Sequence, residues 1–213
     1  DWSASAHDVL HVVAGNETGP AAPLPTDNYN GMTIAASKRD VDGTFSIVAD
    51  LNTYDEDADG SRTSIDLIAP GDNIELTSLG TISLTDSGTS FAAPHVTGTV
   101  ALLQEFGDDK IMNVGGIHWD PNNPLKHEVM KAVLLNSADK LFGVHGSLRT
   151  VESRDATGNY NWLASPAALD VEIPLDLEFG AGHLNAQRAL KQFENGEWDN
   201  NTSIPLLGWD LGE

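Results

Sequence analysis

Residues 88–98 read Gly-Thr-Ser-Phe-Ala-Ala-Pro-His-Val-Thr-Gly, which places a serine at the start of a segment with helical spacing. Apolar residues recur there at intervals that predict a helix with one stripe facing a core: Ala92, Val96, Val100 and Leu103. Pro94 falls near the helix start, where the lack of a backbone N–H destabilises the helix least. The positive end of the helix dipole favours negative charge near the oxygen of Ser90, which suits an acyl-transfer nucleophile. The alternative is that Thr89 or Ser90 caps the helix, a common role for both residue types.

The full pattern Gly-Thr-Ser-x-Ala-x-Pro-x-Val-Thr-Gly is far more specific than a serine before a helix. It resembles the nucleophile signature of the subtilisin-like serine proteases, the subtilases. Other segments resemble further elements of this family in the family's own order: Val12–Glu17, Tyr29–Ser37, Ile65–Gly71 and Phe179–Ala186. The resemblance covers most of the chain. It implies an α/β fold of three layers, a mostly parallel sheet between helices, with the N-terminal strands absent from this chain.

The resemblance also implies roles for individual residues. Ser90 is the expected nucleophile, and Asn16 is expected to donate its amide to the oxyanion together with the backbone N–H of Ser90. An alcohol is almost wholly protonated at neutral pH, so Ser90 needs a histidine base that an aspartate orients. Subtilases carry these two residues upstream of the asparagine, where this chain has only 15 residues. His95 is expected to be a structural core residue rather than the base.

Two short motifs could in principle replace the missing base and its partner. Asp86-Ser87-Gly88 is similar to the family's aspartate motif, and His145-Gly146-Ser147 is similar to its histidine motif. Each is three residues long and lies on the wrong side of Asn16. The interpretation we favour is a turn before the nucleophile and a glycine-containing loop.

The chain therefore corresponds to the C-terminal portion of a subtilase catalytic domain over residues 1–193, followed by an acidic tail or linker over 194–213. Insertions relative to the family are expected at about 107–125 and 143–177. Apolar residues in the tail suggest that it docks on the domain or continues into a further segment. A cleavage product or an incomplete sequence would explain this organisation. Such a piece would expose one edge of a parallel sheet, so it should be unstable alone or pair with the missing portion, in the same or a separate chain.

Hydrophobic periodicity predicts the elements between the motifs. We expect helices at 1–10, from the nucleophile to 104–106, at 127–138 and at 186–193. We expect strands at 10–14, 32–37, 44–49 and 65–68, and one or two short strands within 74–84.

Composition excludes several classes of partner. The formal charge is −21, from 32 acidic and 11 basic residues. Nucleic acids and anionic membranes need a basic surface, so neither is an expected partner. No apolar run approaches membrane-spanning length. The chain has no cysteine, which is compatible with the secreted location that we expect. The acidic surface suits a saline environment, bound divalent cations or simply solubility.

Asp55, Asp57 and Asp59 alternate along an acidic segment that ends in Gly60, as in the first half of a calcium-binding EF-hand loop. Asp66 falls at the twelfth position, where an EF-hand loop has its last ligand, but it belongs to a predicted strand. The resemblance favours calcium as well, because subtilases often bind calcium for stability. We therefore expect a structural calcium ion at these aspartates, with a solvated acidic loop as the alternative. No other cofactor is expected. The histidines show no metal-ligand spacing: His7, His11, His118, His127 and His183.

The sequence thus predicts a serine endopeptidase of the subtilisin type that forms an acyl-enzyme at Ser90 and acts on peptides or proteins. Without its histidine and aspartate, this chain alone should be nearly inactive. The alternative is a non-catalytic protein that retains the subtilase scaffold for binding or assembly.

Overall fold

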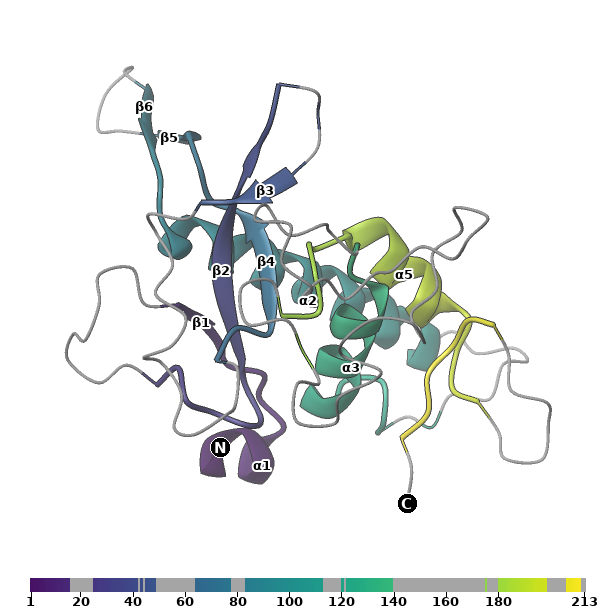
Figure 1. Ribbon diagram of the computed structural model, residues 1–213. Helices are drawn as coiled ribbons and strands as arrows, with labels where there is room; N and C mark the ends of the chain where they lie inside the picture. The colour runs from purple at the N-terminus through teal and green to yellow at the C-terminus, as the bar shows by residue number, and fades with distance from the viewer. Residues whose placement is uncertain are drawn as a thin grey trace, which may run out of the picture.

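The computed structural model describes residues 1–15, 25–41, 43, 45–48, 64–77, 83–112, 120, 122–139, 175, 180–198 and 206–211. Figure 1 shows the arrangement of their helices and strands. Among the described helices, none is long and apolar enough to cross a membrane.

The strand β2 (Met32–Arg39) lies at the centre of the main sheet. Two strands pair with it in parallel on opposite sides, because Ile34 is in register with both Ala14 of β1 (Val12–Ala14) and Leu67 of β4 (Leu67–Pro70). Its C-terminal end pairs antiparallel with β3 (Phe45–Ile47). The first six residues of β2 are buried, as expected for a parallel strand covered on both faces.

The main core lies between this sheet and three helices, α2 (Thr89–Met112), α3 (His127–Ser137) and α5 (Ala186–Glu194). Ile34 and Ala36 point into it, whereas Ala35 joins a smaller cluster on the opposite face, as the two-residue period of a strand requires. Figure 1 shows α2 crossing behind β2 and β4, with α3 and α5 beyond β4. The expected α/β class with a mostly parallel sheet is confirmed.

The helix α2 is longer than its sequence pattern indicates. We expect it to end at 104–106 and a loop to begin at Gly107, but the helix continues to Met112. A Cβ on Gly107 would lie 3.4 Å from atoms of Leu125, Phe193 and Pro124. Gly107 therefore allows neighbouring segments to pack closely against α2, and it does not end the helix.

The other elements lie close to their predicted positions. A short helix α1 (Trp2–His7) precedes β1. The segment expected to hold one or two strands forms an antiparallel hairpin of β5 (Ile74–Thr77) and β6 (Ser83–Asp86), which leads directly into α2.

The segment Gly180-Ala181-Gly182-His183 extends the sheet beyond β4. The amide of Ile68 donates to the carbonyl of Gly182 at 3.0 Å, and His183 forms an isolated bridge with Ile68 and another with Asp139. Gly180 and Gly182 have φ angles of +57° and +127°, and a Cβ on either would lie 2.3 Å from a backbone carbonyl oxygen. Both glycines are thus required by the close passage of the backbone.

The described part of the C-terminal segment docks on α5. Trp209 is 7% exposed and stacks on Phe193 with 5.8 Å between ring centroids. Its indole N–H donates to the carbonyl of Phe193 at 3.2 Å. This contact satisfies the polar end of a buried tryptophan.

Candidate active site around Ser90

The turn before Ser90 rests on the end of β4. The amide of Gly88 donates to the carbonyl of Gly71 at 2.7 Å, and the amide of Phe91 donates back to Gly88 at 3.0 Å. A Cβ on Gly71 would lie 2.7 Å from the Gly88 carbonyl oxygen and 2.8 Å from the Cβ of Ala36. Glycine at position 71 therefore lets the start of α2 approach the sheet.

Thr89 joins the start of α2 to the end of β1. Its side chain is buried, and its hydroxyl donates to the carbonyl of Gly15 at 2.7 Å. The amide of Gly15 in turn donates to the carbonyl of Ile34 at 2.9 Å, which holds it on the sheet. Thr89 immediately precedes Ser90, and Gly15 immediately precedes Asn16. Ser90 and Asn16, the two predicted site residues, thus each directly follow one partner of the Thr89–Gly15 hydrogen bond.

Asn16 itself lies outside the described residues, so its amide is not placed. Ser90 is exposed in the first turn of α2. Its hydroxyl makes no hydrogen bond with any residue that the structure describes. For Ser90, the cap alternative needs this oxygen to accept a backbone N–H of the first turn, and no such bond is present among the described residues.

His95 departs from its expected position. We expect a buried core histidine, but the side chain is exposed. Its Nδ1 lies 2.9 Å from the carbonyl of Phe91, and since a carbonyl only accepts, Nδ1–H is the donor. Five residues after Ser90, His95 lies about 140° around the helix from it. The expectation that His95 is not the base for Ser90 agrees with this geometry.

The motif Asp86-Ser87-Gly88 forms a turn. The hydroxyl of Ser87 donates to Asp72 at 2.8 Å and accepts from the amide of Asn73 at 2.9 Å. Asp86 accepts from the amide of Ser87 at 2.9 Å. These bonds account for the motif as local structure. His145-Gly146-Ser147 lies outside the described residues.

A serine and a histidine do form a hydrogen-bonded pair elsewhere, at Ser37 and His183. Ser37 Oγ lies 2.9 Å from His183 Nε2, while His183 Nδ1 donates to the carbonyl of Leu184 at 2.9 Å. Nε2 is therefore the acceptor for the Ser37 hydroxyl. Burial lowers the pKa of His183, and nearby His95 adds to this, against the opposing effects of the Leu184 carbonyl and Asp139.

This pair cannot act on a substrate. Ser37 is 1% exposed and His183 is 4% exposed, with Phe45 stacked on the imidazole at 4.0 Å between centroids. The pair joins β2 to the segment 180–183 and has a structural role. Sequence reasoning missed it because the two residues are far apart in the chain, and the segments Tyr29–Ser37 and Phe179–Ala186 give no sign that they meet.

The predicted calcium ligands Asp55, Asp57 and Asp59 lie outside the described residues. The structure does place Asp66, at the twelfth position of that pattern, and its carboxylate already interacts with other residues. One carboxylate oxygen accepts from the amide of Thr33 at 2.8 Å, and the other lies 3.0 Å from Lys131 Nζ. The calcium prediction therefore depends on the three aspartates without Asp66.

Comparison with known proteins places this geometry in a family. The model of the Subtilase family matches residues 1–158. Subtilisin BL of Lederbergia lenta is 30% identical over 104 residues, which are 48% of this chain and 34% of that protein. The subtilisin-like serine protease Pen ch 13 of Penicillium rubens is 40% identical over 95 residues, which are 44% of this chain and 21% of that protein. The chain thus spans about a third or less of the length of these relatives.

Solved structures show the same fold at lower identity. Fervidolysin from Fervidobacterium pennivorans, a keratinolytic enzyme related to subtilisin, has a TM-score of 0.53 at 22% identity, over 88% of this chain and 23% of that one. The PatG macrocyclase in complex with peptide has a TM-score of 0.54 at 21% identity, over 89% of this chain and 44% of that one. The family model spans more than half of the chain and includes the nucleophile signature. This chain belongs to the subtilase family.

Proposed function

We propose that this chain carries the nucleophile and the oxyanion donor of a subtilisin-type serine endopeptidase. The observation that carries the proposal is the hydrogen bond from Thr89 to Gly15, which ties the residue before Ser90 to the residue before Asn16. The exposed hydroxyl of Ser90 at the start of α2, which has no hydrogen bond to any described residue, supports it. So does membership of a family whose curated relatives are named as subtilisins and subtilisin-like serine proteases.

In this proposal Ser90 Oγ attacks the carbonyl carbon of a peptide bond and forms an acyl-enzyme, which water then hydrolyses. Asn16 donates its side-chain amide to the oxyanion, and the backbone N–H of Ser90 is the second donor. Both donors are neutral, so they stabilise the developing charge without adding a group that titrates. The positive end of α2 acts in the same direction.

The base is supplied from outside this chain. Within the described ranges no histidine is hydrogen-bonded to Ser90, and the described serine–histidine pair is buried at Ser37. We therefore propose that the histidine and aspartate come from a preceding portion of the same domain, in the same or a separate chain. The 213-residue chain alone is expected to be nearly inactive.

Labelling with a serine-directed fluorophosphonate tests this proposal. We expect the isolated chain to be labelled at Ser90 no faster than at Ser87, an ordinary serine three residues earlier. We expect fast labelling at Ser90 in a longer protein that also supplies the histidine and aspartate, and none after Ser90→Ala. Fast labelling of the isolated chain would show that a base is present within it. Slow labelling of the longer protein would favour the non-catalytic scaffold.

Three further expectations belong to this proposal. The substrate is a peptide or protein, the enzyme acts after secretion, and a calcium ion at Asp55, Asp57 and Asp59 stabilises the fold. A melting temperature that responds neither to calcium nor to a chelator would exclude the calcium site.

A further inference from the structure

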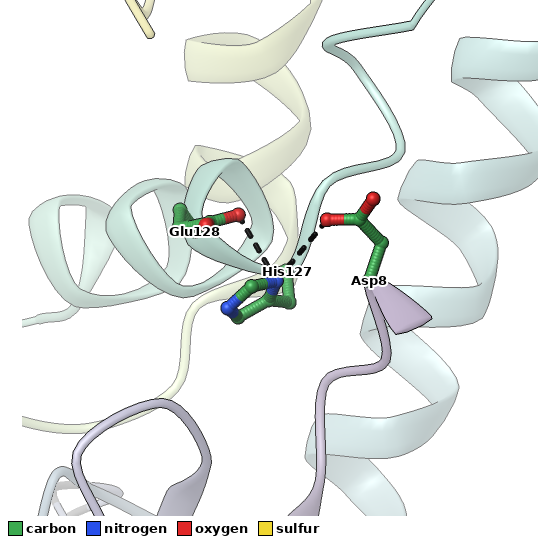
Figure 2. A group of neighbouring side chains, drawn as sticks. All are labelled: Asp8, His127 and Glu128. Atoms are coloured by element: carbon green, nitrogen blue, oxygen red, sulfur yellow. Dashed lines mark ion pairs between the residues drawn. The ribbon is translucent and has the colours of Figure 1, made fainter. Parts of the chain in front are cut away.

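Three ionisable side chains from distant segments meet at the junction of α1 and α3. Asp8 directly follows α1, while His127 and Glu128 are the first two residues of α3. One ligand atom from each lies within 4.8 Å of the other two. Figure 2 shows both carboxylates pointing toward the same ring nitrogen of His127 from different sides.

The buried histidine is the most informative member of this cluster. Its side chain is 3% exposed, and Nδ1 is a buried atom without a hydrogen-bond partner. Nevertheless, Nδ1 lies 3.0 Å from a Glu128 oxygen and 3.5 Å from an Asp8 oxygen. A buried polar atom without a partner costs free energy, so we expect Nδ1 of His127 to bind a ligand.

A proton on Nδ1 could bond to only one of the two carboxylates. One N–H can point at one acceptor, whereas here two carboxylates flank the nitrogen and neither makes a hydrogen bond with it. A metal ion beside Nδ1 would instead be surrounded by all three groups. Ligand atoms at about 2.0–2.2 Å from a tetrahedral zinc ion lie roughly 3.3–3.6 Å from one another. The two distances from Nδ1 fall close to this value.

The donor set selects the kind of ion. Calcium and magnesium take oxygen ligands, whereas one imidazole and two carboxylates suit zinc. The positive end of α3 opposes a bound cation only weakly, and the two negative charges outweigh it. Lys126 Nζ lies 3.3 Å from Oδ2 and 3.5 Å from Oδ1 of Asp8, and Oδ1 is the oxygen that faces His127.

We propose that Asp8, His127 and Glu128 bind one Zn²⁺ ion, with a water molecule as the fourth ligand. The two carboxylates are about half exposed, at 50% and 54%, so their side chains can turn to close the coordination sphere. The ion joins the end of α1 to the start of α3. The site is separate from Ser90 and independent of the proposed peptidase activity.

The test is metal binding by the folded protein, with cooperative melting as evidence that each variant folds. Calorimetric titration with ZnCl₂ should show one tight site, and Co²⁺ should give the intense visible absorption of a four-coordinate ion. At a free Zn²⁺ concentration about 100-fold above its Kd, the melting temperature should rise by roughly 5–10 °C, and EDTA should reverse this.

Asp8→Asn and Glu128→Gln should each weaken zinc binding at least about 100-fold, because even outer partners of zinc ligands are worth about 10- to 100-fold. Glu105→Gln, at another exposed helix glutamate, is the matched control and should bind like the parent protein. The proposal is overturned if the parent protein shows no saturable site. It is equally overturned if the three variants bind zinc alike, because the ion would then lie elsewhere on the acidic surface.

Discussion

Ser90 and Ser37 occupy opposite environments in the same molecule. Ser37 is buried at the end of β2 and already has the partner that a catalytic serine needs, a histidine at 2.9 Å. Ser90 is exposed at the start of a helix and has no such partner among the described residues. The comparison teaches that a serine–histidine hydrogen bond alone does not mark a nucleophile. Exposure to a substrate distinguishes Ser90 from Ser37, and the proposed function adds donors for the oxyanion.

The strongest test of this contrast is to remove each hydroxyl in a protein that contains this chain together with the required histidine and aspartate. Ser90→Ala should lower kcat by about six orders of magnitude, the loss that a subtilisin shows, because the attacking atom is gone. Its unfolding free energy should change by less than about 0.5 kcal/mol, since the side chain is exposed. Peptide hydrolysis and urea unfolding measure the two effects.

Ser37→Ala should show the reverse pattern. It should leave kcat close to the parent value and cost about 1–3 kcal/mol of stability, because Nε2 of His183 becomes an unpaired buried acceptor. Loss of hydrolysis in a well-folded Ser37→Ala protein would mean that the roles of the two serines have been assigned the wrong way round.

Thr89 tests whether the contact between α2 and β1 positions Ser90. Thr89→Val keeps the shape of the side chain but removes the hydrogen bond to Gly15. We expect a 10- to 100-fold lower kcat with little change in KM, because a small misplacement of the nucleophile is enough to have this effect. Thr89→Ser, which retains the hydroxyl, should recover most of the activity.

A purely structural role for Thr89 would look different. Thr89→Val would then lose stability with its hydrogen bond and Thr89→Ser with its methyl group, and kcat per folded molecule would stay unchanged in both. Steady-state kinetics on material of verified folded fraction separates the two cases.

The smallest effect concerns the pH dependence of His183. Burial lowers its pKa in the folded protein below the ordinary value of 6.5, so the unfolded chain takes up this proton first as pH falls. The stability from neutral His183 should be complete above pH 6.5 and decrease below it, until the pH reaches the lowered pKa. Urea unfolding at about pH 7.5 and about pH 5.5 measures this loss.

The control for this dependence is His183→Gln, which cannot be protonated. Its stability should fall less between the two pH values than that of the parent protein. An identical fall in both proteins would assign the acid sensitivity to another group.

The elements of the core could be predicted because their periodicity is local. The short, mostly apolar run of β2 and the helical spacing after Ser90 indicate each element without knowledge of its neighbours. The end of α2 could not be predicted, because a glycine such as Gly107 often ends a helix. Only the structure shows that Leu125 and Phe193 pack against this position, which explains the glycine.

Only the site residues that belong to a family motif could be predicted. Ser90 and Asn16 were found through a family pattern, and their roles remain predictions. The pair Ser37–His183 and the cluster of Asp8 with His127 could not be found, because tertiary contacts alone bring these residues together. His95 was misplaced because its buried role was inferred from the family resemblance, whereas it lies off the stripe of Ala92, Val96, Val100 and Leu103 that enters the core.

The segment Gly180–His183 has a consequence for how the chain folds. It completes the sheet beside β4 through hydrogen bonds between residues more than a hundred positions apart, such as Ile68 and Gly182. Closing so long a loop is entropically costly, so these contacts form late in folding. On a ribosome, β4 would leave the exit tunnel long before its neighbour is synthesised. Until then its edge lacks this partner and can pair with strands of other chains, which favours aggregation during this interval.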